Sequence, residues 1–279
     1  MNDTAREYIS YGKFIVPLLR AKKTITPEEI RWGNKNQYFL YFPAQEPRKN
    51  KTVIHIHGGG WNSRTPKMDY FVGQSIAAEG YDCFMMDYRK TPKYHYDDIA
   101  DDVFRGYVEI RKYISEKGLS CGRPIIMGYS AGAHLSAVLC FDKERQKKFN
   151  ISKDSFSGLL SMAGPLYFGL PQTGTLNTLL KYLFGTKDKT QWEKGEPYRM
   201  IHPKENFKLC MIQSKHDGLV GWDQAVEFMN KAEANGISSE IYEVTDAWNT
   251  HSAYCVGSFL KKRSESNTLD TVFKMLEKL

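Results

Sequence analysis

The sequence has few cysteines, and their distribution excludes two classes of protein. The 279 residues include only five, an odd number with no Cys-x-x-Cys pair, which argues against a disulfide framework and a thiolate metal site. Three of them, Cys83, Cys140 and Cys210, lie in apolar runs, where a free thiol packs as a small core residue. We therefore expect a chain from a reducing compartment, with no metal.

Long hydrophobic runs are also missing. No stretch reaches the ~18 apolar residues that a membrane-spanning helix needs. Near the start of the sequence the longest apolar stretch, residues 14–19, is short and contains Pro17, so it does not fit a signal peptide. These two absences predict a soluble, cytoplasmic chain with no membrane partner.

Acidic residues are outnumbered by basic ones, at 32 against 39, which gives a formal net charge of +7. The lysines are scattered, as on solvated helix faces, and form no basic stripe interleaved with aromatics. We therefore predict no nucleic-acid partner. A hydrophobic content of 41% supports a sizeable core, and residues 1–279 are expected to form a single domain.

Short apolar runs alternate with segments of helical periodicity, which predicts a mostly parallel sheet with helices on both faces. Strands are predicted at residues 36–42, 51–57, 81–88, 124–128, 157–163, 209–214 and 239–244. Helices are predicted at residues 66–80, 96–118, 130–141, 222–236, 251–261 and 269–279.

The alternation breaks at residues 164–207, which contain four prolines and an amphipathic piece at residues 176–184. This segment is either an ordinary helical connection or a small helical lid, because loops at the carboxyl ends of parallel strands carry binding and gating. Residues 1–22 are a second candidate for covering the site.

The pentapeptide Gly-Tyr-Ser-Ala-Gly occupies residues 128–132, between an apolar strand and an apolar helix. This context is typical of a nucleophile elbow. A side chain at position 128 or 132 would collide with neighbouring backbone, and Ser130 would have strained dihedral angles. The turn would expose the Ser130 hydroxyl at the positive end of the following helix.

A second glycine motif, His-Gly-Gly-Gly-Trp, occupies residues 57–61 directly after a predicted strand. Consecutive glycines can turn backbone N–H groups into a cavity with no side chain in the way. Acyl transfer needs such donors, because its tetrahedral intermediate carries a localised negative oxygen. The loop precedes the serine elbow by one strand–helix–strand unit, where the second half of an oxyanion hole is expected.

Together with Asp-Tyr-Arg at residues 87–89, His-Asp-Gly-Leu-Val at residues 216–220 and the late His251, these motifs resemble the α/β-hydrolase family. The resemblance is to its hormone-sensitive-lipase-like carboxylesterases and kynurenine formamidases, and it spans nearly the whole chain. It implies an α/β-hydrolase fold and Ser130 as the nucleophile. The residues that it implies as oxyanion-hole donors are Gly59, Gly60 and Ala131.

A serine nucleophile needs a base, and the base needs an orienting carboxylate, in the chain order serine, acid, histidine. His251 is the only histidine that follows both the elbow helix and a plausible acid loop. Asp217 is the favoured acid, because it follows a predicted strand and precedes Gly-Leu-Val. Asp246 and Asp223 are the alternatives, and each also suits a turn or a helix cap.

The other histidines are given structural roles. His57 is expected to hold the glycine loop by hydrogen bonds, with help from residues 87–89. His55 is expected in the core, and His134 is expected to pack on the elbow helix. Aromatic residues expected to line the substrate pocket, unless they simply pack in the core, are Trp61, Tyr129 and Trp248.

The predicted activity is hydrolysis of a small-molecule ester with a short acetyl or aryl group, without metal or cofactor. An arylformamidase would use the same triad; the continuation Ser-Ala-Gly-Ala-His-Leu at residues 130–135 favours it, and Gly60 argues against it. A carbohydrate acetyl esterase is another alternative. A non-catalytic ligand-binding protein is the alternative from a different class, and the complete set of catalytic residues argues against it. The sequence does not predict the oligomeric state.

Overall fold

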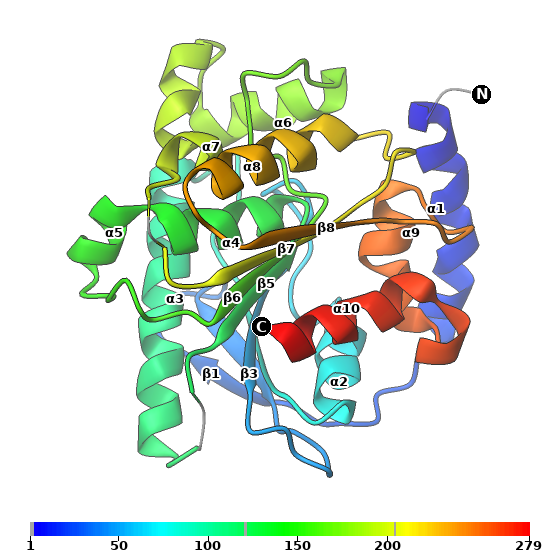
Figure 1. The fold of residues 1–279 in the computed structure, drawn as a ribbon. Helices are drawn as coiled ribbons and strands as arrows, with labels where there is room; N and C mark the ends of the chain where they lie inside the picture. The colour runs from blue at the N-terminus through cyan, green and yellow to red at the C-terminus, as the bar shows by residue number, and fades with distance from the viewer. Residues whose placement is uncertain (1–2, 120–121, 204) are drawn as a thin grey trace.

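The computed structural model describes residues 3–119, 122–203 and 205–279, so Cys121 lies outside the described residues. A central sheet has helices on both faces (Figure 1). Its eight strands run in the order β1-β2-β4-β3-β5-β6-β7-β8. The pairs β1–β2 and β2–β4 are antiparallel, and every pairing from β4 through β3 to β8 is parallel. The predicted mostly parallel sheet is therefore confirmed.

The strands are short and, apart from the two edges, buried. Their bounds are β1 Glu28–Arg31, β2 Tyr38–Phe42, β3 Thr52–Ile56, β4 Asp82–Met86, β5 Ile125–Tyr129, β6 Gly158–Met162, β7 Lys208–Gln213 and β8 Ser239–Glu243. All seven predicted strands are present. The eighth, β1, was not predicted, because its sequence Glu-Glu-Ile-Arg is charged and largely exposed and has no apolar run to reveal it.

The helices include five that were predicted, with shifted ends, and the first part of the sixth, residues 251–261. The bounds are α1 Asp3–Arg20, α2 Tyr70–Ala78, α3 Tyr96–Glu116, α4 Ala131–Phe141, α5 Lys143–Lys148, α6 Gly174–Phe184, α7 Pro197–Met200, α8 Trp222–Ala234, α9 His251–Cys255 and α10 Asn267–Lys278. One prediction was wrong in part: residues 251–261 do not form one helix. Helix α9 ends at Cys255, and a separate 3₁₀ turn, Gly257–Leu260, follows, because Val256 and Gly257 are poor residues for a helix interior.

Alternate residues of the strands point to opposite faces of the sheet and pack in two separate hydrophobic cores. In β3, for example, Ile54 and Ile56 pack toward α3, α4 and α8, whereas Val53 packs on the opposite face with α2 and α10. Helix α4 is buried along its whole length. It follows strand β5 after a single residue, so its first residue, Ala131, lies at the carboxyl end of this central strand. The elbow therefore stands at the middle of the sheet.

The two elbow glycines are required by close packing, as predicted. A Cβ atom at Gly132 would lie 2.0 Å from the carbonyl oxygen of Ile56, and one at Gly128 would lie 2.5 Å from the Gly132 backbone. Both obstacles are backbone atoms, which cannot rotate away as a side chain can. Helix α4 can approach strands β3 and β5 this closely only because both residues are glycine.

Gly132→Ala is expected to lower the free energy of unfolding by at least about 2 kcal/mol, because α4 must move away from β3 to admit the methyl group. Urea unfolding followed by circular dichroism measures this. Gly174→Ala, at the first residue of α6 with no atom within 4 Å of the added Cβ, is the matched control. Equal stability of the two variants would contradict the packing argument.

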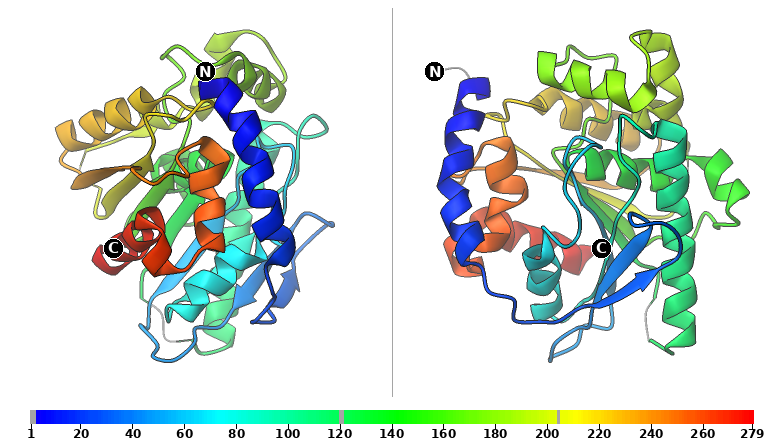
Figure 2. Two further views of the ribbon diagram at one scale, coloured as in Figure 1. Left: turned by 90° about the vertical axis from the view of Figure 1, so that its right-hand side faces the viewer. Right: turned by 180° about the vertical axis from the view of Figure 1, so that it is seen from behind.

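Helix α1 lies beside α9 on one flank of the molecule, as Figures 1 and 2 show from three directions. This packing brings α1 next to a helix that is far from it in the sequence and that begins with His251. Of the helices that the structure describes, none combines the length and the apolar character of a membrane span.

Candidate active site

Ser130 occupies the sharp turn between β5 and α4 with φ 53° and ψ −125°. A positive φ is unusual for serine and costs energy unless the surroundings hold it. Here Ser130 N donates to Met162 O at 2.8 Å, and His134 N donates to Ser130 O at 3.1 Å. The strained serine expected of the elbow is therefore present.

Asp217 and His251 come together although 34 residues separate them. The Asp217 carboxylate follows β7, and its Oδ2 lies 2.8 Å from Nδ1 of His251, the first residue of α9. The same Oδ2 accepts a hydrogen bond from the Tyr254 hydroxyl at 2.8 Å. Oδ1 accepts from the amides of Leu219 at 2.9 Å and Val220 at 2.8 Å. With both oxygens engaged, the carboxylate is held in one orientation toward the imidazole.

The environment of His251 favours its protonated form. Burial by itself lowers the pKa of the imidazole, but the charge of Asp217, its hydrogen bond and the charge of Glu7 outweigh burial. The net effect raises the pKa of His251 above its ordinary value of 6.5. An imidazole of this kind is a strong proton acceptor once it is neutral.

The two alternative acids lie elsewhere. Asp246 binds the start of α10, where it accepts from Ser266 Oγ and from the amides of Asn267 and Thr268. Asp223 lies in the first turn of α8. Of the three carboxylates, Asp217 is therefore the one that the fold brings to His251.

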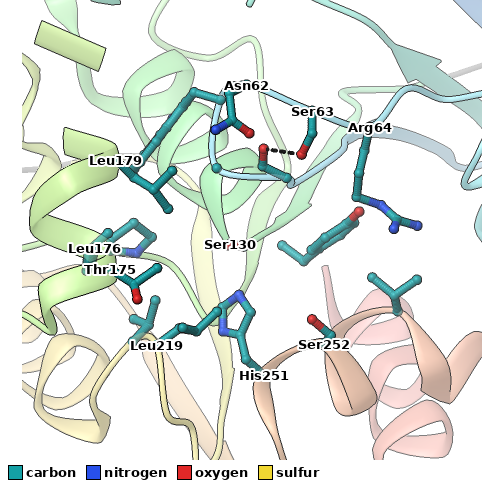
Figure 3. Close-up of a pocket in the computed structure, with 17 residues that line it drawn as sticks. Asn62, Ser63, Arg64, Ser130, Thr175, Leu176, Leu179, Leu219, His251 and Ser252 are labelled. Atoms are coloured by element: carbon teal, nitrogen blue, oxygen red, sulfur yellow. Dashed lines mark hydrogen bonds between the residues drawn. The ribbon is translucent and has the colours of Figure 1, made fainter. Parts of the chain in front are cut away.

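Ser130 and His251 line one cavity of about 220 Å³. In Figure 3 the His251 imidazole extends toward Ser130, with Leu176 and Leu179 of α6 on one side. Thr175 and the acid-loop residue Leu219 continue the same wall. The cavity is small and largely apolar around the serine, and part of its wall comes from residues 164–207.

The glycine loop forms another part of the wall. Gly59, Gly60 and Trp61 have φ values of 100°, 58° and 59°, so three consecutive residues take the left-handed conformation. A Cβ at Gly59 would lie 2.6 Å from Ser63 O. Among the described residues, none accepts a hydrogen bond from the backbone N–H of Gly59, Gly60 or Ala131.

His57 supports this loop from behind, as predicted. Its Nδ1 lies 2.7 Å from Gly58 O, and its Nε2 lies 2.9 Å from Asp87 Oδ1. The Tyr88 hydroxyl donates to His57 O at 3.0 Å, and its ring stacks on the imidazole. Residues 87–89 thus contribute to the support of the glycine loop.

Of the three aromatic residues predicted to line the cavity, Trp61 and Tyr129 do so and Trp248 does not. Trp61 and Tyr129 line the cavity but are almost fully buried, and their polar atoms are bound inside the protein, to His134 Nδ1 and Asp69 Oδ2 respectively. Trp248 is not part of the cavity wall; its ring lies against the Lys261 ammonium, 4.1 Å from the ring centroid. Trp248 is close to His251 in the sequence, but closeness in sequence does not fix the direction of a side chain.

Sequence reasoning missed two kinds of site residue. The cavity's apolar lining comes largely from leucines of α6 and the acid loop, and the amphipathic spacing of residues 176–184 was the available signal for the first group. Tyr254 donates a hydrogen bond to the same Asp217 oxygen that contacts His251, and it lies three residues further along the same short helix.

Across the described ranges, no cluster of three or more His, Cys, Asp or Glu residues could hold a metal ion.

Comparisons with known proteins show similarity over most of the chain. The BD-FAE family model matches residues 39–232, which include the glycine loop, the elbow and Asp217. The isoprenylcysteine α-carbonyl methylesterase ICME of Arabidopsis thaliana is 26% identical over 225 residues, covering 74% of this chain and 52% of the relative. The hormone-sensitive lipase of Mus musculus is 32% identical over 94 residues, 33% of this chain and 12% of the lipase. The chain thus spans about half the length of the first of these relatives.

Solved structures share the whole fold. Esterase B from Lactobacillus rhamnosis, in a C6-C4 SN3 inhibited form, superposes with a TM-score of 0.77 at 17% identity. The match covers 99% of this chain and 94% of the esterase. Another structure of that esterase is inhibited by a C4-C4 SN3 tributyrin phosphonate. The α/β-hydrolase fold and the resemblance to hormone-sensitive lipase are therefore confirmed.

Proposed function

This chain belongs to the BD-FAE family, and we propose that it is a serine carboxylesterase that hydrolyses short-chain acyl esters. The observation that carries the proposal is the 2.8 Å contact between Asp217 Oδ2 and His251 Nδ1, beside Ser130 in one cavity. A nucleophile, a base and an orienting acid in this relation are what acyl transfer to serine requires.

In the proposed reaction, Ser130 Oγ attacks the ester carbonyl while His251 Nε2 takes the hydroxyl proton. The N–H groups of Gly59, Gly60 and Ala131 bind the oxyanion that forms. The imidazolium then protonates the departing alcohol, which leaves the acyl group on Ser130. Water, deprotonated by His251, attacks this acyl-enzyme and releases the acid. Throughout, Asp217 keeps the proton on Nδ1, so that Nε2 faces the serine.

The preference for short acyl groups rests on the size and lining of the cavity. A space of about 220 Å³ is below the usual range of ~300–1,000 Å³ for small-molecule sites. Leu176 and Leu179 limit it on the α6 side, so residues 164–207 are proposed as the cover that sets acyl length. The tributyrin phosphonate bound by esterase B fits this proposal, because tributyrin is an ester of a four-carbon acid.

A panel of substrates tests the proposal. p-Nitrophenyl acetate, butyrate and octanoate, N-formylkynurenine and an acetylated oligosaccharide are compared at one pH, with Ser130→Ala as the blank. We expect kcat/KM to be highest for acetate or butyrate and at least about tenfold lower for octanoate, because each methylene that the pocket cannot hold reduces binding.

The other results would redirect the assignment. Faster deformylation of N-formylkynurenine than ester cleavage would indicate the arylformamidase alternative, and a preference for the oligosaccharide would indicate a carbohydrate acetyl esterase. If no substrate is turned over faster by the wild type than by Ser130→Ala, the esterase proposal is wrong. The ligand-binding alternative would then stand.

A further inference from the structure

Three side chains of helix α1 hold the segment that leads into α9 and ends at His251. Arg6 Nη2 donates to Asn249 Oδ1 at 3.0 Å, and the hydroxyls of Ser10 and Thr250 lie 2.5 Å apart. Between them Glu7 Oε1 accepts a hydrogen bond from the backbone amide of His251 at 2.5 Å. These contacts join segments about 240 residues apart, as the neighbouring positions of α1 and α9 in Figure 2 illustrate.

Glu7 makes a second contact that the other two side chains do not. The same Oε1 accepts from the amide of Gly218 at 3.1 Å, and Gly218 directly follows Asp217. A single buried oxygen, on a residue that is only 4% exposed, therefore bridges the loop of the acid and the loop of the base.

From this bridge we propose that Glu7 is a positioning residue of the triad: it sets the acid and base loops relative to each other and places a negative charge behind His251. The inference rests on the esterase proposal for its catalytic meaning. Glu7 acts through His251, because among the described residues none of α1 lines the cavity. It is therefore not a catalytic residue itself.

The charge of Glu7 is not explained by folding alone. Its second oxygen, Oε2, is buried and has no hydrogen-bond partner among the described residues. A buried carboxylate with one unpaired oxygen costs stability, and a neutral amide could accept the same two N–H groups. The carboxylate does have a use in catalysis, because an imidazolium forms at His251 during each proton transfer and a nearby negative charge stabilises it.

Three other titratable groups, Asp217, Tyr254 and Cys255, lie near Glu7 and His251. Burial raises the pKa of the Glu7 carboxyl, while its two amide donors and the charge of His251 lower it, for a net rise. Asp217 is the other carboxylate that faces the imidazole. Tyr254 and Cys255, on α9, have pKa values raised by burial well above their ordinary range, so they add no charge near neutral pH.

Glu7→Gln separates charge from packing, because its amide oxygen can still accept from both N–H groups. The matched control is Glu196→Gln: Glu196 is 1% exposed, and its Oε1 also accepts two backbone amides, from Phe168 at 2.5 Å and Gly169 at 3.0 Å. The first measurement is the pKa of the His251 imidazole by NMR titration of histidine-labelled protein, with His251→Ala to assign the signal. This readout does not depend on turnover.

We expect the pKa of His251 in Glu7→Gln to be at least about 0.5 pH unit below that of the wild type, and unchanged in Glu196→Gln. The sign follows from the charge: without it the imidazolium is less stable, so the proton leaves at lower pH. The acid limb of kcat/KM follows the ionisation of the general base, so it is expected to move to lower pH together with the pKa of His251.

Glu7→Ala removes the bridge itself and is expected to lower kcat at high pH by about tenfold or more with little change in KM. An unchanged His251 pKa in Glu7→Gln, or an equal fall in Glu196→Gln, would overturn the inference. If the wild type has no Ser130-dependent activity, the esterase proposal fails, and the NMR titration still decides the role of the Glu7 charge. A thermal unfolding midpoint of Glu7→Gln that is no lower than that of the wild type excludes misfolding as the cause.

Discussion

Replacing Ser130 with alanine is expected to lower kcat for p-nitrophenyl acetate by at least about 10⁴-fold. The substitution removes the only protein atom proposed to form a bond to the acyl carbon. The remaining activity would come from the free N–H donors and from water activated by His251. KM should change little, because the hydroxyl contributes little to ground-state binding.

The measurement is steady-state hydrolysis by purified wild type and variant, with mass spectrometry after treatment with an alkyl phosphonate. We expect one phosphonyl adduct on the wild type and none on Ser130→Ala. Ser136→Ala is the matched control, because Ser136 is a buried serine of helix α4, which begins directly after Ser130. A Ser130→Ala variant that retains activity within tenfold of the wild type, with the fold intact, would exclude Ser130 as the nucleophile.

Asp217→Asn is expected to lower kcat by about 10³–10⁴-fold while leaving the fold in place. The asparagine oxygen can still accept from the amides of Leu219 and Val220. Its NH₂ group then faces His251 Nδ1 and the Tyr254 hydroxyl, where the carboxylate had accepted from both. The imidazole would respond by placing its proton on Nε2, which can then no longer accept the Ser130 proton.

Asp246→Asn is the control that also tests the alternative acid. Asp246 accepts three hydrogen bonds at the start of α10, so its replacement is expected to reduce stability. Activity per folded molecule should stay within about twofold of the wild type, because this residue does not contact the triad. A large loss of kcat in Asp246→Asn together with near-normal kcat in Asp217→Asn would reverse the assignment of the acid.

The parts of the site that could be predicted from sequence are those that a short segment determines by itself. The elbow is such a case: within five residues, a strained serine and two glycines satisfy a turn that few other sequences tolerate, and the 2.0 Å approach at Gly132 shows why. The glycine loop is another, since its positive φ angles exclude most side chains. The alternation of strands and helices followed from periodicity, except at β1, which is too charged to show it.

Predictions that needed the direction of a side chain were less secure. Trp248 lies three residues before His251, yet its ring packs against Lys261 and not in the cavity. The apolar lining comes instead from leucines of α6, a helix whose position over the serine depends on the whole course of residues 164–207. Local spacing indicated an amphipathic helix there but could not say what its apolar face would cover.

The sequence by itself determined the strained turn at Ser130, the glycine loop at residues 57–61 and the fold class, because backbone sterics and hydrophobic period act over a few residues. Only the tertiary structure decided that Asp217 and not Asp246 contacts His251, and that Glu7 bridges their loops across 211 and 244 residues of chain. Such contacts arise when separate elements dock on a common core, and no local pattern encodes which buried side chains will then face one another.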